Sequence, residues 1–236
     1  MGRAQPAMLR LLERAKRRTA DAELFAGLVQ ACRYAGLLEA SVAAYESAER
    51  VEPGIRTSVA HSYFMLGLYE RAIETEVADP PEVAFMALLM TGREAEALER
   101  LRSIEQSIPS RSGPLYQGIV ARRNLLEGKR SECLLATHQI LEKNTLRDPC
   151  GLFYMGRHLV YLGDGERGLD LLLSSIEGGF CCHSFATRDP WLDPIRSRPE
   201  FRDYLARSAV RYGESVKAFL AAGGDRVLGV TPAVTA

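Results

Sequence analysis

The sequence predicts an all-α fold built from consecutive helix pairs, and two observations support this. A short phrase recurs in which a glycine is followed five residues later by a small residue. The apolar residues on both sides of each phrase follow a helical period, as Leu24, Leu28 and Cys32 do. Glycine accepts the left-handed conformation that ends a helix, and the small residue lets a second helix approach the first. The five phrases are Gly36–Ser41, Gly67–Ala72, Gly92–Ala97, Gly128–Cys133 and Gly163–Gly168.

The first element, within residues 1–21, is expected to be a single helix that caps the array or forms half of a repeat. Its apolar residues Met8, Leu11 and Leu12 share one face, and its arginines lie on the others. The helix pairs follow within residues 22–178. In the middle of this range, Tyr69–Val77 and Glu82–Met90 are expected to be short helices, because the intervening Asp-Pro-Pro forbids a continuous one.

The elements of the carboxy-terminal part are a loop and a cap. The glycine pair at 178–179 ends the last repeat helix. Within residues 179–222 we expect a loop, a short helical segment after Asp189 and a long helix that begins at Pro199. Trp191 is expected to be buried against the last repeat, because an end repeat must cover its apolar face. Residues 223–236 are expected to be disordered.

The chain resembles the tetratricopeptide repeat family in the order of its repeat residues. The first repeat carries the family pattern at Phe25, Leu28, Gly36, Tyr45, Ala48 and Pro53. The resemblance implies a right-handed α-solenoid of about five helical hairpins over residues 22–178, followed by a capping helix. The stretch Asp189–Arg196 with Pro199 and Phe201 also resembles the tail of such arrays in bacterial signalling proteins. That likeness implies a regulatory part of a signalling or transcription system.

In that family the first helix of each pair lines a concave groove. The resemblance therefore implies a scaffold that binds a protein or peptide there, and the arginines in the groove favour a partner with acidic and apolar residues. No catalytic residue, metal or cofactor is expected, and the chain is not expected to be an enzyme. The implied binding residues are Gln30, Arg33, His61, Phe64, Met86, Leu89, Arg122, Phe153 and Arg157.

Composition excludes several other classes of partner and compartment. Lysine plus arginine and aspartate plus glutamate each number 30, so no general attraction to nucleic acid or membrane is expected. No apolar stretch approaches the roughly 18 residues that a membrane helix needs. The amino terminus lacks the apolar core of a signal peptide. With five irregularly spaced cysteines, these features favour a reducing, cytoplasmic setting.

Two alternative functions remain open at this point. Cys181, Cys182 and His183 are adjacent and could form a thiol-based sensor or an enzyme site. We favour a structural loop, because no second pair of metal ligands exists and no thiolate activator is recognisable apart from His183 and Arg188. Changing both cysteines to serine is then expected to alter stability by at most about 0.5 kcal/mol. The other alternative is an oligomerisation module in which a terminal helix pairs with another copy.

Overall fold

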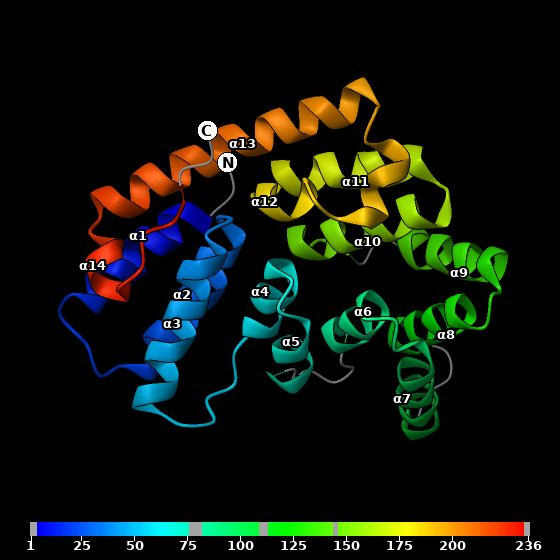
Figure 1. Ribbon diagram of the computed structural model, residues 1–236, viewed down its shortest axis with the longest axis horizontal. Helices are drawn as coiled ribbons and strands as arrows, with labels where there is room; N and C mark the ends of the chain where they lie inside the picture. Colours follow the sequence, from blue (N-terminus) through cyan, green and yellow to red (C-terminus); the bar gives the residue numbers. More distant parts are fainter. Residues whose placement is uncertain (1–3, 76–81, 109–112, 144–145, 234–236) are drawn as a thin grey trace.

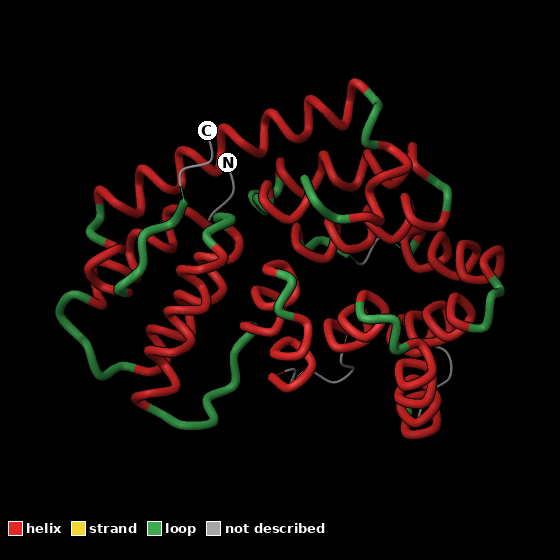
Figure 2. The backbone as a smooth tube through the Cα atoms, viewed as in Figure 1, coloured by secondary structure: helices red, strands yellow, loops and turns green. Residues whose placement is uncertain are grey.

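The computed structural model describes residues 4–75, 82–108, 113–143 and 146–233. Within these ranges the chain forms fourteen α-helices and one 3₁₀ helix, and it contains no strand (Figure 2). The prediction of an all-α protein is confirmed. No helix among the described residues is both long enough and apolar enough to cross a lipid bilayer.

Ten of the helices form five consecutive pairs, one around each repeated phrase. The turn glycines all have positive φ, from 72° at Gly92 to 97° at Gly163, as the predicted helix ends require. The Asp-Pro-Pro stretch lies outside the described residues. The pairs are α2 (Ala22–Tyr34) with α3 (Leu38–Val51), α4 (Val59–Leu66) with α5 (Tyr69–Thr75), α6 (Glu82–Met90) with α7 (Glu94–Ser107), α8 (Pro114–Leu126) with α9 (Arg130–Glu142), and α10 (Pro149–Leu162) with α11 (Gly165–Glu177).

The small residue of each phrase brings the two helices of a pair together. In α10 and α11 the backbones approach so closely that a Cβ atom at Gly168 would lie 2.7 Å from the carbonyl oxygen of Gly156. In α2 and α3 the buried Ser41 hydroxyl donates a hydrogen bond of 2.7 Å to the Val29 carbonyl. The five small residues, Ser41, Ala72, Ala97, Cys133 and Gly168, are all buried.

The remaining helices join the two ends of the array. Helix α1 (Ala4–Ala15) packs on α2, and α12 (His183–Ala186) and η1 (Pro190–Ile195) follow the last pair. The long α13 (Pro199–Ala221) then runs back from α11 to α1 (Figure 1). The first and last helices therefore contact each other, whereas the open solenoid that the resemblance implies would keep its ends apart.

The expectation of disorder after residue 222 is wrong for the residues described there. Helix α14 (Gly224–Leu228) packs against α3 and α1. Beyond it, the Tyr212 hydroxyl donates a hydrogen bond of 2.7 Å to the carbonyl of Ala233. The physical reason is apolar burial, because Leu228 is only 8% exposed and Val227 and Val230 pack on the core.

Candidate functional site

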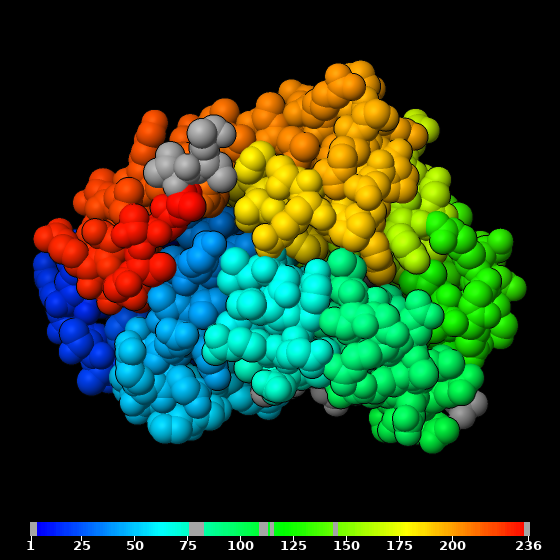
Figure 3. All heavy atoms as spheres, in the orientation of Figure 1, coloured from blue at the N-terminus to red at the C-terminus, as the bar shows by residue number. Residues whose placement is uncertain are grey.

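The inner surface is the set of nine side chains that the sequence implies for the groove: Gln30, Arg33, His61, Phe64, Met86, Leu89, Arg122, Phe153 and Arg157. Residues 180–192 of the same chain lie against the middle of this surface. We call this stretch the covering segment. Its spheres fit closely against those of α4 in the space-filling view, below α13 (Figure 3).

Aromatic rings hold the covering segment to the inner surface. The Phe185 ring lies 5.4 Å from the Phe64 ring, and the Phe180 ring lies 5.4 Å from the Phe153 ring, measured between centroids. All four side chains are 5% exposed or less. Aromatic pairs at such separations contribute roughly 0.5–1.5 kcal/mol beyond the burial of their area. The groove is therefore filled here with packed rings.

Two hydrogen bonds to main-chain carbonyls fix the position of the covering segment. The Cys181 N–H donates a hydrogen bond of 2.9 Å to the Tyr34 carbonyl at the end of α2. The Arg188 guanidinium donates to the carbonyl of Met65 in α4. The segment is thus tied to the first and second helix pairs, which lie far from it in the sequence.

A buried ion pair completes this contact. The Arg157 guanidinium donates from Nε to one carboxylate oxygen of Asp189 and from Nη2 to the other, the latter at 3.2 Å. Both side chains are fully buried. The Trp191 ring lies 3.9 Å from Arg157 Cζ, and its backbone N–H donates to Asp189 at 3.1 Å. Arg157 therefore binds this carboxylate through two hydrogen bonds. The sequence predicted such a pair with a partner's carboxylate, but here the carboxylate belongs to the same chain.

The expectation that the nine side chains line an open groove is wrong for most of them. The covering segment and the helices around it supply partners that exclude solvent. His61 donates to or accepts from the Tyr154 hydroxyl at 3.1 Å, and Leu89 packs against the core. Gln30 is exposed, and Arg122 lines an open cavity. The five buried members are Arg33, Phe64, Met86, Phe153 and Arg157.

One hollow beside the covered region is an apolar groove of about 580 Å³. It lies between α1 and α2 on one side and the turn after α11 on the other. We call it the amino-terminal groove. Glu177 is its one charged wall residue among those described, and most of its other side chains are small. Its walls are Ala4, Ala7, Leu11, Gly27, Gln30, Ala31, Tyr34, Pro149, Glu177, Gly178 and Gly179.

The second hollow is a cavity of about 300 Å³ between α6, α8, α9, α10 and η1, which we call the α8–α10 cavity. Its walls are mostly apolar and aromatic. No Asp or Glu is found among the described residues that line it. Its walls include Phe85, Arg122, Ile140, Tyr154, His158 and Trp191.

Two histidines near these hollows are neutral in the folded protein. Burial lowers the pKa of His61 to about 3, with a further contribution from the charge of Arg33. Burial also lowers the pKa of His158 to about 3, and the charges of Arg122, Arg157 and Arg130 add to the effect. At neutral pH neither ring is protonated, so neither histidine supplies a positive charge to these hollows.

Cys181 and Cys182 lie in the expected loop before α12, but both are buried in the core, which differs from the assumption that this loop lies away from buried contacts. They are 3% and 1% exposed, and burial raises the pKa of both thiols. The Cys182 thiol contacts Met65 Sδ at 3.3 Å, and the Cys181 thiol donates to the Ser208 carbonyl at 3.3 Å. Such surroundings disfavour a reactive thiolate. Within the described part of the chain, no cluster of three or more His, Cys, Asp or Glu residues could hold a metal ion.

The oligomerisation alternative would pair a terminal helix with another copy, but the terminal helices pack within the chain. Helices α1 and α13 contact each other, and both contact α14. Their apolar faces are thus used inside the molecule, since Met8, Leu12, Phe201 and Phe219 are each 0% exposed. Pairing with another copy stays a prediction.

The covering segment supplies site residues that sequence reasoning missed. Phe180, Phe185 and Asp189 were assigned to a loop and its turn, with no role on the inner surface. A signal existed, because the inner positions carry Phe64 and Phe153, and large apolar side chains of that kind need a cover. Trp191 was predicted to be buried, and the residue is 8% exposed, with its ring stacked on that of Tyr161 in α10 at 4.2 Å between centroids.

Comparison with known proteins adds no assignment. The chain matches no family profile, no curated protein sequence and no solved structure.

Proposed function

We propose that this chain is a helical-repeat interaction module of the tetratricopeptide kind that binds a segment of a partner protein and catalyses no reaction. The observation that carries the proposal is the covering segment. The inner surface already holds a stretch of polypeptide through stacked rings, main-chain hydrogen bonds and an arginine–carboxylate pair. Main-chain hydrogen bonds, apolar pockets and arginine–carboxylate pairs are contacts that peptide-binding domains commonly use.

The partner segment binds in the amino-terminal groove, where the inner surface is open. Gln30 stands there, on the same helix as the buried Arg33. The small side chains of Ala7 and Ala31 leave room for a helical or extended backbone to approach closely. The apolar walls supply the affinity, because exposed ion pairs contribute only about 0–1 kcal/mol each. The acidic preference expected from three arginines is weakened, since Arg33 and Arg157 are engaged inside the molecule.

The likeness of Asp189–Arg196 to tails in bacterial signalling proteins makes those systems the first place to search for the partner. Cytoplasmic signalling complexes would then be the setting of the interaction. This part of the proposal rests on the resemblance alone, because no family profile and no curated sequence matches the chain.

A peptide selection tests the proposal. Random peptides are displayed against the immobilised full chain, and the enriched peptides are measured by fluorescence anisotropy. We expect enrichment of apolar peptides and a loss of at least about tenfold in affinity for Gln30→Trp, which fills the groove. Leu135→Trp is the matched control, because Leu135 is 60% exposed on α9. Failure to enrich any peptide contradicts the function, and equal binding by Gln30→Trp contradicts its placement in this groove.

A further inference from the structure

Arg33 is a buried cation that pairs with no carboxylate among the described residues. It stands in the last turn of α2 and is 4% exposed. The other buried arginine, Arg157, has the Asp189 carboxylate as its counter-charge. A guanidinium does not lose its proton in a protein, so burying it is costly unless an anion lies beside it. The counter-charge of Arg33 must therefore come from another kind of group.

The thiol of Cys150 is the acceptor that lies nearest to this guanidinium. Arg33 Nη1 donates to the Cys150 sulfur at 2.8 Å, and Nη2 donates to the Ser58 hydroxyl at 3.5 Å. Of these two acceptors, only the thiol ionises readily. Burial lowers the pKa of Arg33, but its interactions with Cys150, Tyr154 and Tyr34 outweigh burial and raise that pKa. The same attraction favours the thiolate form of the cysteine.

The place of Cys150 in α10 favours a negative charge as well. Asp148 caps this helix and Pro149 opens it, so Cys150 stands in the first turn. The unpaired N–H groups and the dipole at a helix N-terminus stabilise an anion there. The Asp148 carboxylate opposes this effect, but it accepts hydrogen bonds from the Tyr34 hydroxyl and the Gly151 N–H.

The other four cysteines lie in surroundings of the opposite kind. Burial raises the pKa of the Cys32 thiol to about 12 and that of the Cys133 thiol to about 11. It also raises the pKa of Cys181 and of Cys182. Within the described part of the chain, no arginine donates a hydrogen bond to any of these four sulfur atoms. Cys150 is therefore distinguished by its partner and by its place in a helix.

Two features suit Cys150 to reaction with a small oxidant. The residue is 3% exposed, but the next residue, Pro149, lines the amino-terminal groove, and so does Tyr34, which follows Arg33. The groove thus brings solvent to within one residue of the pair. In addition, the buried Arg33 Nε–H has no acceptor among the described residues. An oxygen atom added to the sulfur would find this unused donor in the same guanidinium.

We propose that Cys150 is the thiolate counter-charge of Arg33 and that peroxide oxidises it to a sulfenic acid. The thiolate sulfur attacks one oxygen of hydrogen peroxide, so that an S–O bond forms as the O–O bond breaks. Hydroxide leaves and takes a proton from solvent to become water. The sulfur is oxidised and the peroxide is reduced. This inference does not depend on the partner binding proposed for the amino-terminal groove.

Ultraviolet difference spectroscopy of the full chain at neutral pH tests the charge, because a thiolate absorbs where a thiol does not. We expect Cys150→Ala to remove the absorbance of one thiolate and Cys32→Ala to remove none. Arg33→Met should remove the same absorbance, whereas Arg33→Lys, which keeps the charge, should retain most of it. Arg10→Met, at an exposed position of α1, is the matched control. An unchanged spectrum of Cys150→Ala overturns the pairing.

Trapping with dimedone, which reacts with sulfenic acids, tests the oxidation. The reduced full chain is treated with hydrogen peroxide and dimedone, and adducts at each cysteine are followed by mass spectrometry. We expect the adduct at Cys150 to form at least about tenfold faster than at Cys32 or Cys182, and about tenfold slower in Arg33→Met. Circular dichroism checks the fold of that variant, and if it is unfolded the comparison among cysteines of the unmodified chain decides. Equal rates at the three cysteines, or an unchanged rate in folded Arg33→Met, overturn the proposal.

Discussion

Arg122 and Arg157 occupy the same place in two successive helix pairs, since each stands six residues before the glycine that ends its helix. Their surroundings differ. Arg157 is fully buried, pairs with Asp189 and contacts the rings of Trp191, Phe64 and Phe185. Arg122 is partly exposed and lines the α8–α10 cavity. One arginine pairs with a buried carboxylate of the same chain, and the other lies at the wall of a cavity.

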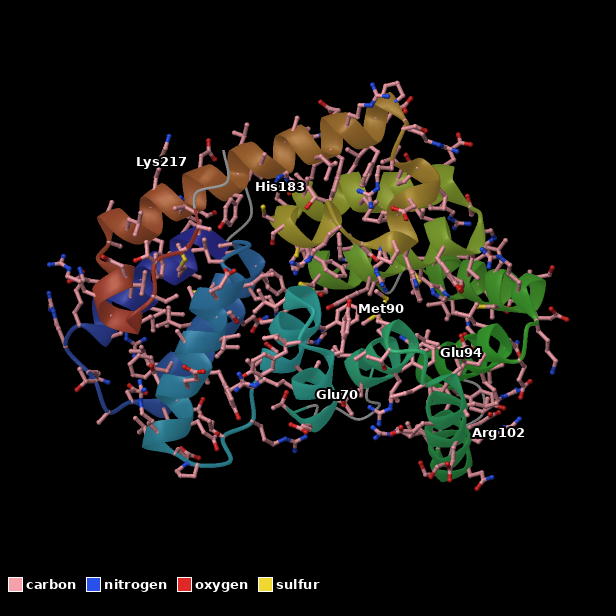
Figure 4. The ribbon with its side chains drawn as sticks, in the orientation of Figure 1. Glu70, Met90, Glu94, Arg102, His183 and Lys217 are labelled. Atoms are coloured by element: carbon pink, nitrogen blue, oxygen red, sulfur yellow. The ribbon has the colours of Figure 1, made fainter. Side chains whose placement is uncertain are left out.

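The covering segment causes this difference. It supplies Asp189 and two phenylalanine rings to the part of the inner surface around α4 and α10, and it ends at Trp191, on the wall of the cavity. Arg157 also lies near the sulfur atoms of Met86 and Met90, at 3.5 and 3.7 Å. Figure 4 shows Met90 on α6, facing the region below α10. A repeat position sets the direction of a side chain, and whatever packs over it sets its role.

The largest expected effect follows from removing Arg157. Arg157→Met leaves the Asp189 carboxylate buried without its cation, and breaking a buried pair in this way costs about 3–5 kcal/mol. Urea denaturation measures the free energy of unfolding. Arg122→Met is the matched comparison, and we expect a clearly smaller loss because its guanidinium is partly exposed. The double variant Arg157→Met/Asp189→Asn should recover part of the loss, because the buried charge is gone. Equal losses for the two single arginine variants would contradict the contrast drawn between them.

A smaller effect is expected within the covering segment. Cys182→Ser places a hydroxyl beside Met65 Sδ with no strong acceptor, so we expect a loss of about 1–3 kcal/mol in unfolding free energy. Cys181→Ser is the control, because the Ser208 carbonyl can accept from the new hydroxyl and the loss should be smaller. Thermal denaturation of both variants measures the difference. A Cys182→Ser protein as stable as the unmodified chain would show that the segment is loosely held.

The smallest effect concerns pH and compares the two histidines. In the unfolded chain each ring takes up a proton below about pH 6.5, whereas the folded chain keeps both neutral down to about pH 3. The free energy of unfolding therefore falls as pH drops from 7 to 5, by about 1–2 kcal/mol for each histidine, and neither contributes to the slope above pH 7. Urea titrations at both pH values test this in His61→Gln and His158→Gln. Each variant should show a shallower fall, and an unchanged fall contradicts the burial of that ring.

Local features of the fold were predictable from the sequence because they depend on neighbouring residues. A glycine such as Gly67 or Gly163 needs its left-handed conformation wherever the rest of the chain lies, so the helix pairs followed directly. Pro199 likewise marks the start of α13. Trp191 was predicted to be buried because an end repeat needs a cover, which is a general rule of stacked arrays.

The closure of the array was not predictable, because it depends on contacts between distant residues. Cys181 meets Tyr34, and Arg188 meets Met65, only after the helix pairs have stacked. The repeat pattern predicts that Phe64 and Arg157 point to the inner surface. It does not predict whether water, a partner or the same chain packs against them. Over most of its length the predicted groove is therefore covered by residues 180–192 of the same chain.

The covering segment lines one hollow and directly follows residues that line the other. Gly178 and Gly179, directly before it, line the amino-terminal groove, and Trp191 at its far end lines the α8–α10 cavity. Any occupant that shifts the segment at one end changes the free energy of binding at the other. Thermodynamic reciprocity then requires each occupant to alter the affinity of the other by the same factor. A chain of packed helix pairs would in this way couple the occupants of two separate hollows through one short stretch of backbone.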